Sequence, residues 1–548
     1  MTTRVQPWSE GLRPCGLPYA LTCGDPEGPA PFARLARDCS LVSVLRVVLA
    51  AGALAVTACA HRAPVAPPQA PRTTHVAPRT TQTDLEARVA LIRDVDEILD
   101  APALARATLA VRVDLLNTIP LTLYGRNSTK LVMPASNMKL LTLAAAADRL
   151  GWDFRYTTRL EMAGTIEGGA LRGDLIVVGS GDPAITASGG PAPAFATFAE
   201  GLKRAGITRV DGRIIGDDNA FDDEELGPGW AWDYLSAGYA ARSGALSYND
   251  NQITVRIAPG AAAGEPARIE AVPAGHGLTL VSGIVTVDAA SGASIDVFRL
   301  PGSDRLTLSG TIRVGATAVN RTVSVDNPTR FFADALRLSL EAQGIAVRDG
   351  AWDVDDVADR PPAANRRTLA TYESAPLAEL AKILMKVSAN FDTENVLKTV
   401  GLVVRQEGST AAGRSAARET LTSWGIPPDS YVMYDGSGLS RYNYVSADAI
   451  VRLLTHVWQS ERLRGPFIAS LPIAGRDGTL ANRMRGTVLE GKVEAKTGTI
   501  ANVRSLSGFL ETRSGQRLVF AMIANHYTAS SAQVDAVVER ALTRLAEW

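Results

Sequence analysis

The sequence predicts a mixed α/β (α+β) protein in which a long β-rich region interrupts a body of helices and strands. Apolar residues recur at helical spacing in segments near the start, the middle and the end of the chain. Alternating apolar strings separated by Gly, Asp and Pro clusters fill residues 156–365. With 548 residues, of which 46% are hydrophobic, the chain is long enough for about three or four domains with real cores.

The first 59 residues are interpreted as an export signal. Ten apolar residues at 47–56 follow Arg46 and lead into Thr57-Ala58-Cys59. Such a stretch is too short to span a bilayer but has the length of a signal-peptide core. The ending resembles a bacterial lipobox, so we expect lipidated Cys59 to begin the mature protein. The alternative is an ordinary signal peptide cut after Ala58. A start codon assigned too far upstream would explain residues 1–40.

Residues 60–83 are rich in Pro, Ala and Thr and are expected to form a semi-extended tether. The catalytic domain is expected at 84–155 and 366–548. Its first part should hold a helix from residue 84, a strand near 108–116, and a second hairpin strand within 121–134 that turns at 125–127. A helix that begins at Ser136 and stops at Gly151 follows.

The inserted residues 156–365 are expected to form two β-rich domains. Beyond them, two amphipathic helices near 377–388 and 393–406 enclose an interhelical corner, where functional side chains often project. Strands are expected at 491–499, 505–512 and 517–526, and an amphipathic helix closes the chain.

Charge and composition argue against several classes of partner. The formal net charge is -1, and no basic run is interleaved with aromatic residues, so nucleic acid is not expected to bind. All four cysteines lie in the first 59 residues. The five histidines include no pair at the ligand spacing of a helical metal site. We therefore expect no metal and no cofactor.

Ser136-Asn137-Met138-Lys139 is the predicted nucleophile and base. Only 8 of the 56 basic residues are lysine, and Lys139 alone has a serine three positions before it. An ammonium can lose its proton when desolvated, whereas a guanidinium cannot, so a neutral base must be lysine. Residues three apart on a helix share one face, which would let the Ser136 hydroxyl meet the Lys139 amine.

Two further strings complete the predicted site. Ser388-Ala389-Asn390 matches Ser-x-Asn, as does Ser247-Tyr248-Asn249; the helical corner favours the former. Ser388 would relay a proton between Lys139 and the leaving amine, and Asn390 would hold a substrate carbonyl. Lys496-Thr497-Gly498, unique in the chain, offers a cation and a hydroxyl for a substrate carboxylate. Lys496 would also repel a proton from Lys139. Backbone N–H groups of Ser136 and Thr499 would form the oxyanion hole.

With these strings in order, the chain from about residue 84 to 548 resembles the class C low-molecular-mass penicillin-binding proteins. Similar segments occur at 179–183, 216–218, 247–251 and 435–441, and the long gap between the first two strings is typical of the family. The resemblance implies a transpeptidase-like fold, with an antiparallel sheet flanked by helices and β-rich inserted domains. It also implies a serine-type D-alanyl-D-alanine carboxypeptidase and endopeptidase of peptidoglycan that binds β-lactam antibiotics.

By the same resemblance, Ser136, Lys139 and Ser388 would be catalytic, and Asn390, Lys496, Thr497, Gly498 and Thr499 would bind substrate. The lipobox departs from the common pattern. Ala60 after the cysteine indicates a periplasmic enzyme anchored to the outer membrane.

Other functions remain as alternatives. A serine β-lactamase shares the first and third strings but lacks so large an insertion. A catalytically idle wall-binding lipoprotein would not need to keep rare lysines. A Ser-His-Asp hydrolase is disfavoured because the sequence contains no Gly-x-Ser-x-Gly elbow.

Overall fold

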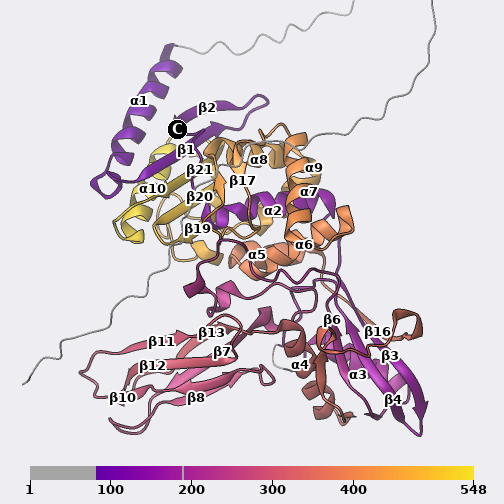
Figure 1. Cartoon of the computed structure of the whole chain (residues 1–548). Coiled ribbons are helices and arrows are strands. Elements are labelled where there is room, and N and C mark those ends of the chain that lie inside the picture. The colour runs from indigo at the N-terminus through magenta and orange to yellow at the C-terminus, as the bar shows by residue number, and fades with distance from the viewer. Residues whose placement is uncertain (1–81, 188–189) are drawn as a thin grey trace, which may run out of the picture. The chain divides into compact units, whose positions relative to one another are not determined.

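A five-stranded antiparallel sheet built from both ends of the chain lies at the centre of the catalytic part (Figure 1). The computed structural model describes residues 82–187 and 190–548. The strand order is β19-β20-β21-β1-β2. Its strands are β1 (Thr108–Leu115), β2 (Leu121–Arg126), β19 (Val493–Ile500), β20 (Val503–Glu511) and β21 (Arg517–Asn525). The signal region, Cys59 and nearly all of the expected tether lie outside the described residues.

Helices cover both faces of this sheet, and strand alternation explains how each face builds a core. On β1, Leu109, Val111 and Val113 face the core shared with α1 (Gln82–Leu99) and α10 (Ser531–Ala546). Ala110 between them faces the opposite core, since successive side chains of a strand point to opposite faces. That second core is formed with α2 (Met138–Arg149), α5 (Leu377–Lys386), α6 (Asn390–Arg405), α7 (Thr410–Ser423), α8 (Ala447–Gln459) and α9 (Glu461–Ser470).

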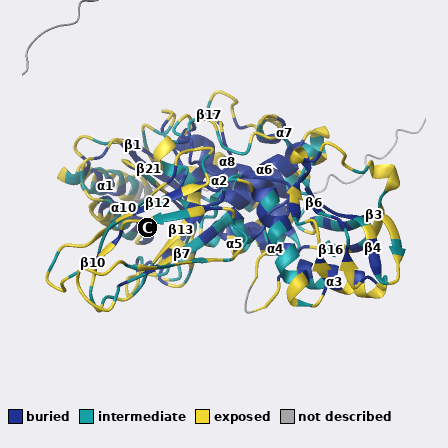
Figure 2. Cartoon of the chain, turned by 60° about the horizontal axis from the view of Figure 1, so that its bottom comes forward, coloured by how far each residue is buried: buried dark blue, intermediate teal, exposed yellow. Residues whose placement is uncertain are grey.

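Helices α2 and α6 are the most deeply buried of this set (Figure 2). Every residue from Met138 to Ala147 in α2 is buried, and so is every residue from Phe391 to Gly401 in α6. The two helices pack against each other. Polar residues on these helices are therefore placed in a dry interior. A short hairpin of β17 (Tyr431–Val432) and β18 (Tyr444–Val445) adjoins them.

The first hairpin differs from its predicted form. Leu115 pairs with Leu121, so the turn between β1 and β2 lies at residues 116–120. Gly125 pairs with Arg112 inside the ladder instead of making a turn. Asn127 ends the strand, with φ of 50° and its Nδ2 donating to the Leu109 carbonyl at 2.9 Å.

The segment between α2 and α5 forms three sheets. The seven-stranded sheet contains β3 (Thr157–Glu167), β4 (Ala170–Val178), β5 (Arg209–Val210), β6 (Ile214–Asp217), β14 (Ala346–Val347), β15 (Ala351–Asp353) and β16 (Arg367–Glu373). It packs with α3 (Pro193–Arg204) and α4 (Pro328–Ala342). Because β16 pairs with β3, this sheet ends beyond residue 365, where the insertion was expected to stop.

Two smaller sheets are nested within that segment. One has three strands, β7 (Gln252–Ala258), β8 (Arg268–Val272) and β13 (Val319–Ser324). The other has four, β9 (Thr279–Ser282), β10 (Val285–Val287), β11 (Ser294–Phe298) and β12 (Arg305–Arg313). Leu306 and Leu308 of β12 share one core with Ile253 and Val255 of β7.

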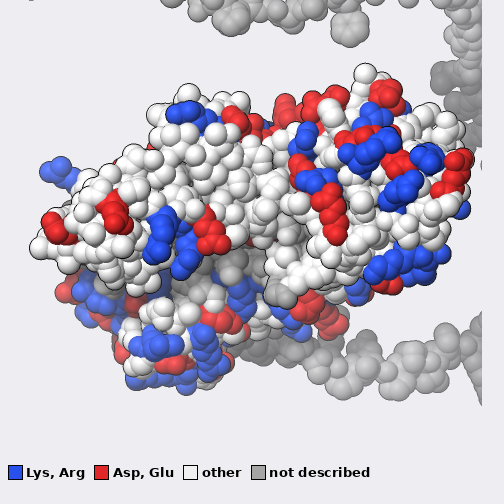
Figure 3. Space-filling model, turned by 90° about the horizontal axis from the view of Figure 1, so that it is seen from below, with Lys and Arg blue, Asp and Glu red and all other residues white. Residues whose placement is uncertain are grey.

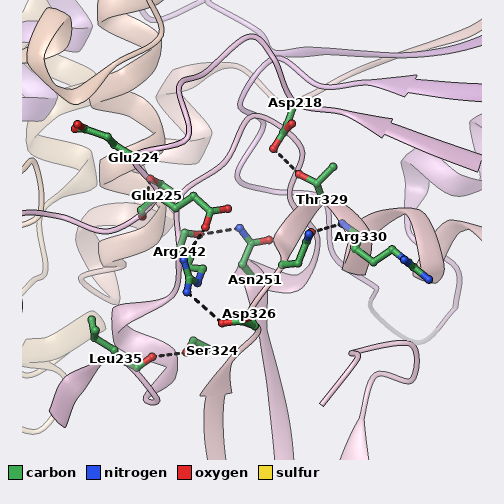
Figure 4. Close-up of polar contacts among 12 residues, drawn as sticks. Asp218, Glu224, Glu225, Leu235, Arg242, Asn251, Ser324, Asp326, Thr329 and Arg330 are labelled. Atoms are coloured by element: carbon green, nitrogen blue, oxygen red, sulfur yellow. Dashed lines mark hydrogen bonds and ion pairs between the residues drawn. The ribbon is translucent and has the colours of Figure 1, made fainter. Parts of the chain in front are cut away.

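Ion pairs fix the chain where it enters and leaves these nested strands (Figure 4). Arg242 donates to Glu225 at 2.8 Å and to Asp326 at 3.1 Å. Thr329, in the first turn of α4, donates to the Asp218 carboxyl group at 2.5 Å. Segments far apart in sequence are thereby tied together next to the catalytic part.

On the face shown in Figure 3, Lys and Arg side chains are interspersed with Asp and Glu. That mixture agrees with the near-zero net charge of the sequence. Within residues 82–187 and 190–548, every helix is too short or too polar to cross a bilayer.

Candidate active site

Ser136 lies in a tight 3₁₀ turn, Ala135–Asn137, immediately before α2. The sequence predicted a helix that begins at Ser136, whereas α2 begins at Met138. Two glycines allow other backbones to approach this turn. A Cβ on Gly498 would lie 3.0 Å from the Ser136 nitrogen, and a Cβ on Gly438 would lie 1.9 Å from the Ala135 carbonyl oxygen. Both positions therefore require glycine.

The Lys139 amine is fully buried and has three oxygen partners. Its Nζ lies 3.1 Å from Ser136 Oγ, 2.6 Å from Asn390 Oδ1 and 2.8 Å from the Ser437 carbonyl oxygen. The amide oxygen and the carbonyl oxygen can only accept hydrogen bonds, while the hydroxyl can donate or accept. The structure thus brings Ser136 and Lys139 together, with Asn390 beside them.

Burial lowers the pKa of Lys139 to about 8, although the carboxyl groups of Glu394, Asp435 and Asp392 act in the opposite direction. A group with this pKa is neutral in an appreciable fraction of molecules near pH 8. Burial and then Lys139 lower the pKa of Lys496 well below its usual range. The repulsion between the two ammonium groups that the sequence predicted is thus expressed in the pKa of Lys496.

Ser388 pairs with Lys496. Lys496 Nζ donates to Ser388 Oγ at 2.7 Å and to the Thr497 carbonyl oxygen at 2.8 Å. Ser388 occupies the corner between α5 and α6 with φ of 63°, a strained conformation for a serine. The expected contact of Ser388 with Lys139 is therefore replaced, in this structure, by a contact with the second lysine.

Asn390 bridges two parts of the chain. Its Oδ1 accepts from Lys139, and its Nδ2 donates to the Tyr239 carbonyl oxygen at 2.8 Å. Tyr239 belongs to the segment between β6 and β7. The expected role of Asn390, holding a substrate carbonyl, would fall to the second hydrogen of its Nδ2.

A cavity of about 710 Å³ opens onto these groups. Ser136, Ser388 and Asn390 line one part of it, and Thr497, Gly498 and Thr499 of β19 line another. Tyr234 and Tyr239 from the inserted region, with Leu439, add an apolar wall. Every predicted catalytic or substrate-binding residue except the buried pair Lys139 and Lys496 reaches this cavity.

The hydroxyl groups on β19 have partners of their own. Thr497 Oγ1 donates to Thr479 Oγ1 at 2.8 Å. Arg504 donates to Thr499 Oγ1 and also pairs with Asp535. Neither Thr479 nor Arg504 was predicted from the sequence, since no motif links them to the strand.

The segment 435–440 contributes most to the site among the parts of the chain for which the sequence predicted no role. Ser437 supplies the carbonyl oxygen for Lys139, and Asp435 is fully buried. Asp435 accepts from the Gly438 and Ser440 N–H groups at 2.8 and 2.6 Å. The glycines of this segment were a usable signal in the sequence for such a role. A buried Asp-Gly-Ser-Gly turn brings backbone oxygens close to a neighbouring side chain.

The other Ser-x-Asn match has a structural explanation. Ser247 is buried, donates to the Gly244 carbonyl oxygen at 3.0 Å and accepts from Asn251 Nδ2 at 3.0 Å. It does not line the cavity described above. Within the described part of the chain, no group of three or more His, Cys, Asp or Glu residues could hold a metal ion.

Comparisons with known proteins place the chain among related sequences. A family model described as the D-Ala-D-Ala carboxypeptidase 3 (S13) family matches residues 91–545. A D-alanyl-D-alanine carboxypeptidase of Actinomadura sp. (strain R39) is 34% identical over 474 residues, covering 84% of this chain and 86% of the relative. The D-alanyl-D-alanine carboxypeptidase DacB of Haemophilus influenzae is 27% identical over 420 residues, covering 76% and 84%.

A solved structure gives the same result for the fold. The crystal structure of penicillin binding protein 4 (dacB) from Haemophilus influenzae matches with a TM-score of 0.72 and 25% identity. The match covers 82% of this chain and 98% of that one. The predicted fold class and the resemblance found in the sequence are both confirmed.

Proposed function

The chain belongs to the D-Ala-D-Ala carboxypeptidase 3 (S13) family, and we propose that it cleaves the terminal D-Ala-D-Ala bond of peptidoglycan stem peptides through an acyl-enzyme on Ser136. The observation that carries this proposal is the set of three oxygens around Lys139 Nζ. It supports a lysine that acts as a base, because it fixes where the amine's lone pair points.

A neutral amine has two hydrogens and one lone pair. Asn390 Oδ1 and the Ser437 carbonyl oxygen can only accept, so they take both hydrogens of neutral Lys139. The lone pair is then directed at Ser136 Oγ, 3.1 Å away, whose hydroxyl must donate. This arrangement activates the serine as a nucleophile.

Acylation follows from that arrangement. Ser136 Oγ attacks the carbonyl carbon of the penultimate D-alanine, and its proton passes to Lys139 Nζ. The peptide C–N bond breaks, and the leaving nitrogen takes up a proton as D-alanine departs. Water then hydrolyses the ester by the same proton path. The backbone N–H groups of Ser136 and Thr499 are proposed to stabilise the oxyanion, an assignment supported by the close approach of Gly498 to the Ser136 nitrogen.

Lys496, Thr497 and Thr499 are proposed to bind the terminal carboxylate of the substrate. Burial and Lys139 lower the pKa of Lys496, and an incoming carboxylate favours its charged form. Ser388, 2.7 Å from Lys496 Nζ, would carry a proton between this lysine and the leaving amine. Gly498 would let the substrate backbone lie against the strand, and Asn390 would contact its peptide group.

The same cavity would accept β-lactam antibiotics, which acylate Ser136 but lack a departing D-alanine. Crosslinks between stem peptides are a second proposed substrate, cleaved as an endopeptidase would. No observation of the site favours a β-lactamase or an idle wall-binding protein over this activity.

Intact-mass analysis with a labelled penicillin tests the proposal. We expect one adduct per chain, with the labelled peptide containing Ser136. Ser136→Ala should remove both the adduct and the release of D-alanine from a pentapeptide, with an unchanged circular dichroism spectrum. A persistent adduct on the Ala variant would refute the assignment of the nucleophile.

An enzyme of the cell wall acts outside the cytoplasm, and we propose that this one is a periplasmic lipoprotein. The support is the apolar core at 47–56 followed by Cys59, with Ala60 next. Two or more acyl chains hold a protein firmly, since each buried methylene contributes about 0.8 kcal/mol. Fractionation decides: Cys59→Ser should move the enzyme from the outer membrane to the soluble fraction, while Cys39→Ser should not. If both variants stay in the membrane fraction to the same extent, the anchor lies elsewhere in the chain.

A further inference from the structure

The carboxyl group of Glu394 in α6 holds the loop that supplies an oxygen to Lys139. Glu394 is 3% exposed. Its Oε2 accepts from the Gly436 N–H at 2.9 Å, and its Oε1 accepts from the Ser437 N–H at 2.8 Å. One buried carboxylate thus clamps two consecutive peptide groups, and charge-assisted bonds of this kind are among the stronger ones.

The peptide group that faces the proposed base, between Ser437 and Gly438, directly follows the two that Glu394 clamps. The Ser437 carbonyl oxygen accepts from Lys139 Nζ at 2.8 Å. A second anchor acts on the residue before it, since Thr142 Oγ1 of α2 donates to the Gly436 carbonyl oxygen at 2.8 Å. The Gly436–Ser437 peptide group, from which the Ser437 carbonyl extends towards Lys139, is therefore held by α6 on one side and by α2 on the other.

We propose that Glu394 is a positioning residue for the reaction. By fixing the loop at Gly436 and Ser437, it aims one hydrogen of the Lys139 amine away from Ser136, so that the lone pair of this amine points at the serine hydroxyl. This inference rests on the proposed role of Lys139 as base. Glu394 does not reach the cavity, so it would act on the rate of acylation and not on the binding of the substrate or the antibiotic.

The charge of the Glu394 carboxylate has a second, independent effect, on the pKa of Lys139. The ionisable groups that face Lys139 are Glu394 and Asp392 on α6, Asp435 on the loop and Lys496 on β19. Glu394 is the largest of the three carboxyl influences that raise the pKa of Lys139. Burial, followed by Asp435, raises the pKa of Glu394 itself to about 7, so its charge is present above that pH. Removing this charge must lower the pKa of Lys139 further.

The test is stopped-flow acylation by a chromogenic penicillin across pH 6–10, which separates the dissociation constant from the acylation rate constant. For Glu394→Gln we expect an acylation rate constant lower by about 10- to 100-fold, as for a misplaced catalytic group, with the dissociation constant within about twofold of the parent. The acid limb of the pH profile should move to lower pH, because a lysine with a lower pKa is neutral at a lower pH.

Two further variants make the result decisive. Thr142→Val loosens the same loop without removing a charge, so it should lower the acylation rate constant and leave the acid limb in place. Glu225→Gln is the matched control: it alters an inserted-region carboxyl group that pairs with Arg242 (Figure 4) and is not among the groups that shift the pKa of Lys139, so it should change neither quantity.

An unchanged rate constant and acid limb in folded Glu394→Gln would overturn the inference, and so would an effect confined to the dissociation constant. If Glu394→Gln does not fold, Thr142→Val decides by its rate constant alone, and an unchanged value overturns the inference. Ser136→Ala run in parallel separates the two claims, because its continued labelling refutes the nucleophile whatever the Glu394 variant does.

Discussion

At the scale of single residues, the site separates two lysines by what surrounds them. Lys139 has two obligate acceptors and one hydroxyl as partners, whereas Lys496 has one hydroxyl and one carbonyl oxygen. Both are fully buried, and burial lowers the pKa of each. Lys139 can thus accept a proton from a serine, and Lys496 can become protonated when an anion binds beside it.

Lys139→Arg should be nearly as inactive as Lys139→Ala. An arginine keeps the charge and can hydrogen-bond, but it does not accept a proton at ordinary pH. Loss of the general base should lower the acylation rate by about 10²- to 10⁴-fold in both variants. Penicillin acylation kinetics measure this. Lys382→Arg, an exchange of an exposed lysine in α5, is the control, and substantial acylation by the Lys139→Arg variant would mean that another group is the base.

At the scale of elements, the site forms where four segments converge: the turn before α2, the corner between α5 and α6, the loop 435–440 and strand β19. Glycines at the contacts make this possible. Gly498 lies so close to its neighbours that a Cβ would be 2.2 Å from Ser505 Oγ and 2.8 Å from the Pro134 carbonyl oxygen. Strand β19 and the nucleophile turn are therefore held at backbone contact.

Gly498→Ala should push β19 away from that turn and reduce acylation by about 100-fold, as a displacement near 1 Å does. Overpacking should also lower the free energy of unfolding by about 1–3 kcal/mol. Acylation kinetics and urea unfolding measure the two effects. Gly465→Ala is the matched control, because nothing lies within 4 Å of its added Cβ on α9. Normal acylation by Gly498→Ala would show that the close approach is not needed.

At the scale of the whole molecule, several carboxyl groups are buried where the inserted region meets the catalytic part. Burial raises the pKa of Asp182 to about 6. Its Oδ1 accepts from the Ala184 N–H at 2.9 Å, while its Oδ2 is buried without a partner. A carboxyl group whose pKa is higher in the folded than in the unfolded chain destabilises the fold as pH rises between those two values.

Asp182→Asn should therefore become more stable than the parent as pH rises from about 4 to about 6, with a change of up to about 3 kcal/mol and a plateau above. Urea unfolding at pH 4, 6 and 8 measures the difference. Asp359→Asn is the control: Arg213 lowers the pKa of that exposed carboxyl group, so its effect on stability changes only below about pH 4 and should be nearly constant from pH 4 to pH 8. A difference that does not vary with pH would contradict the prediction.

The sequence by itself determined the parts that depend on local spacing. Ser136 and Lys139 are three residues apart, so any turn of helix or 3₁₀ geometry brings them together, and Ser388 was correctly placed at a helical corner because apolar periodicity stops there. The family and the fold class followed from the same strings, and the comparisons confirm both.

Only the tertiary structure decided which partner each group has. Ser388 contacts Lys496, which is 108 residues away, and Lys139 contacts the Ser437 carbonyl oxygen, 298 residues away. A backbone oxygen carries no signal in a sequence, and pairings across such separations depend on how the sheet and α6 pack together. The pKa values of both lysines likewise depend on burial by residues from distant segments, which no spacing in the chain records.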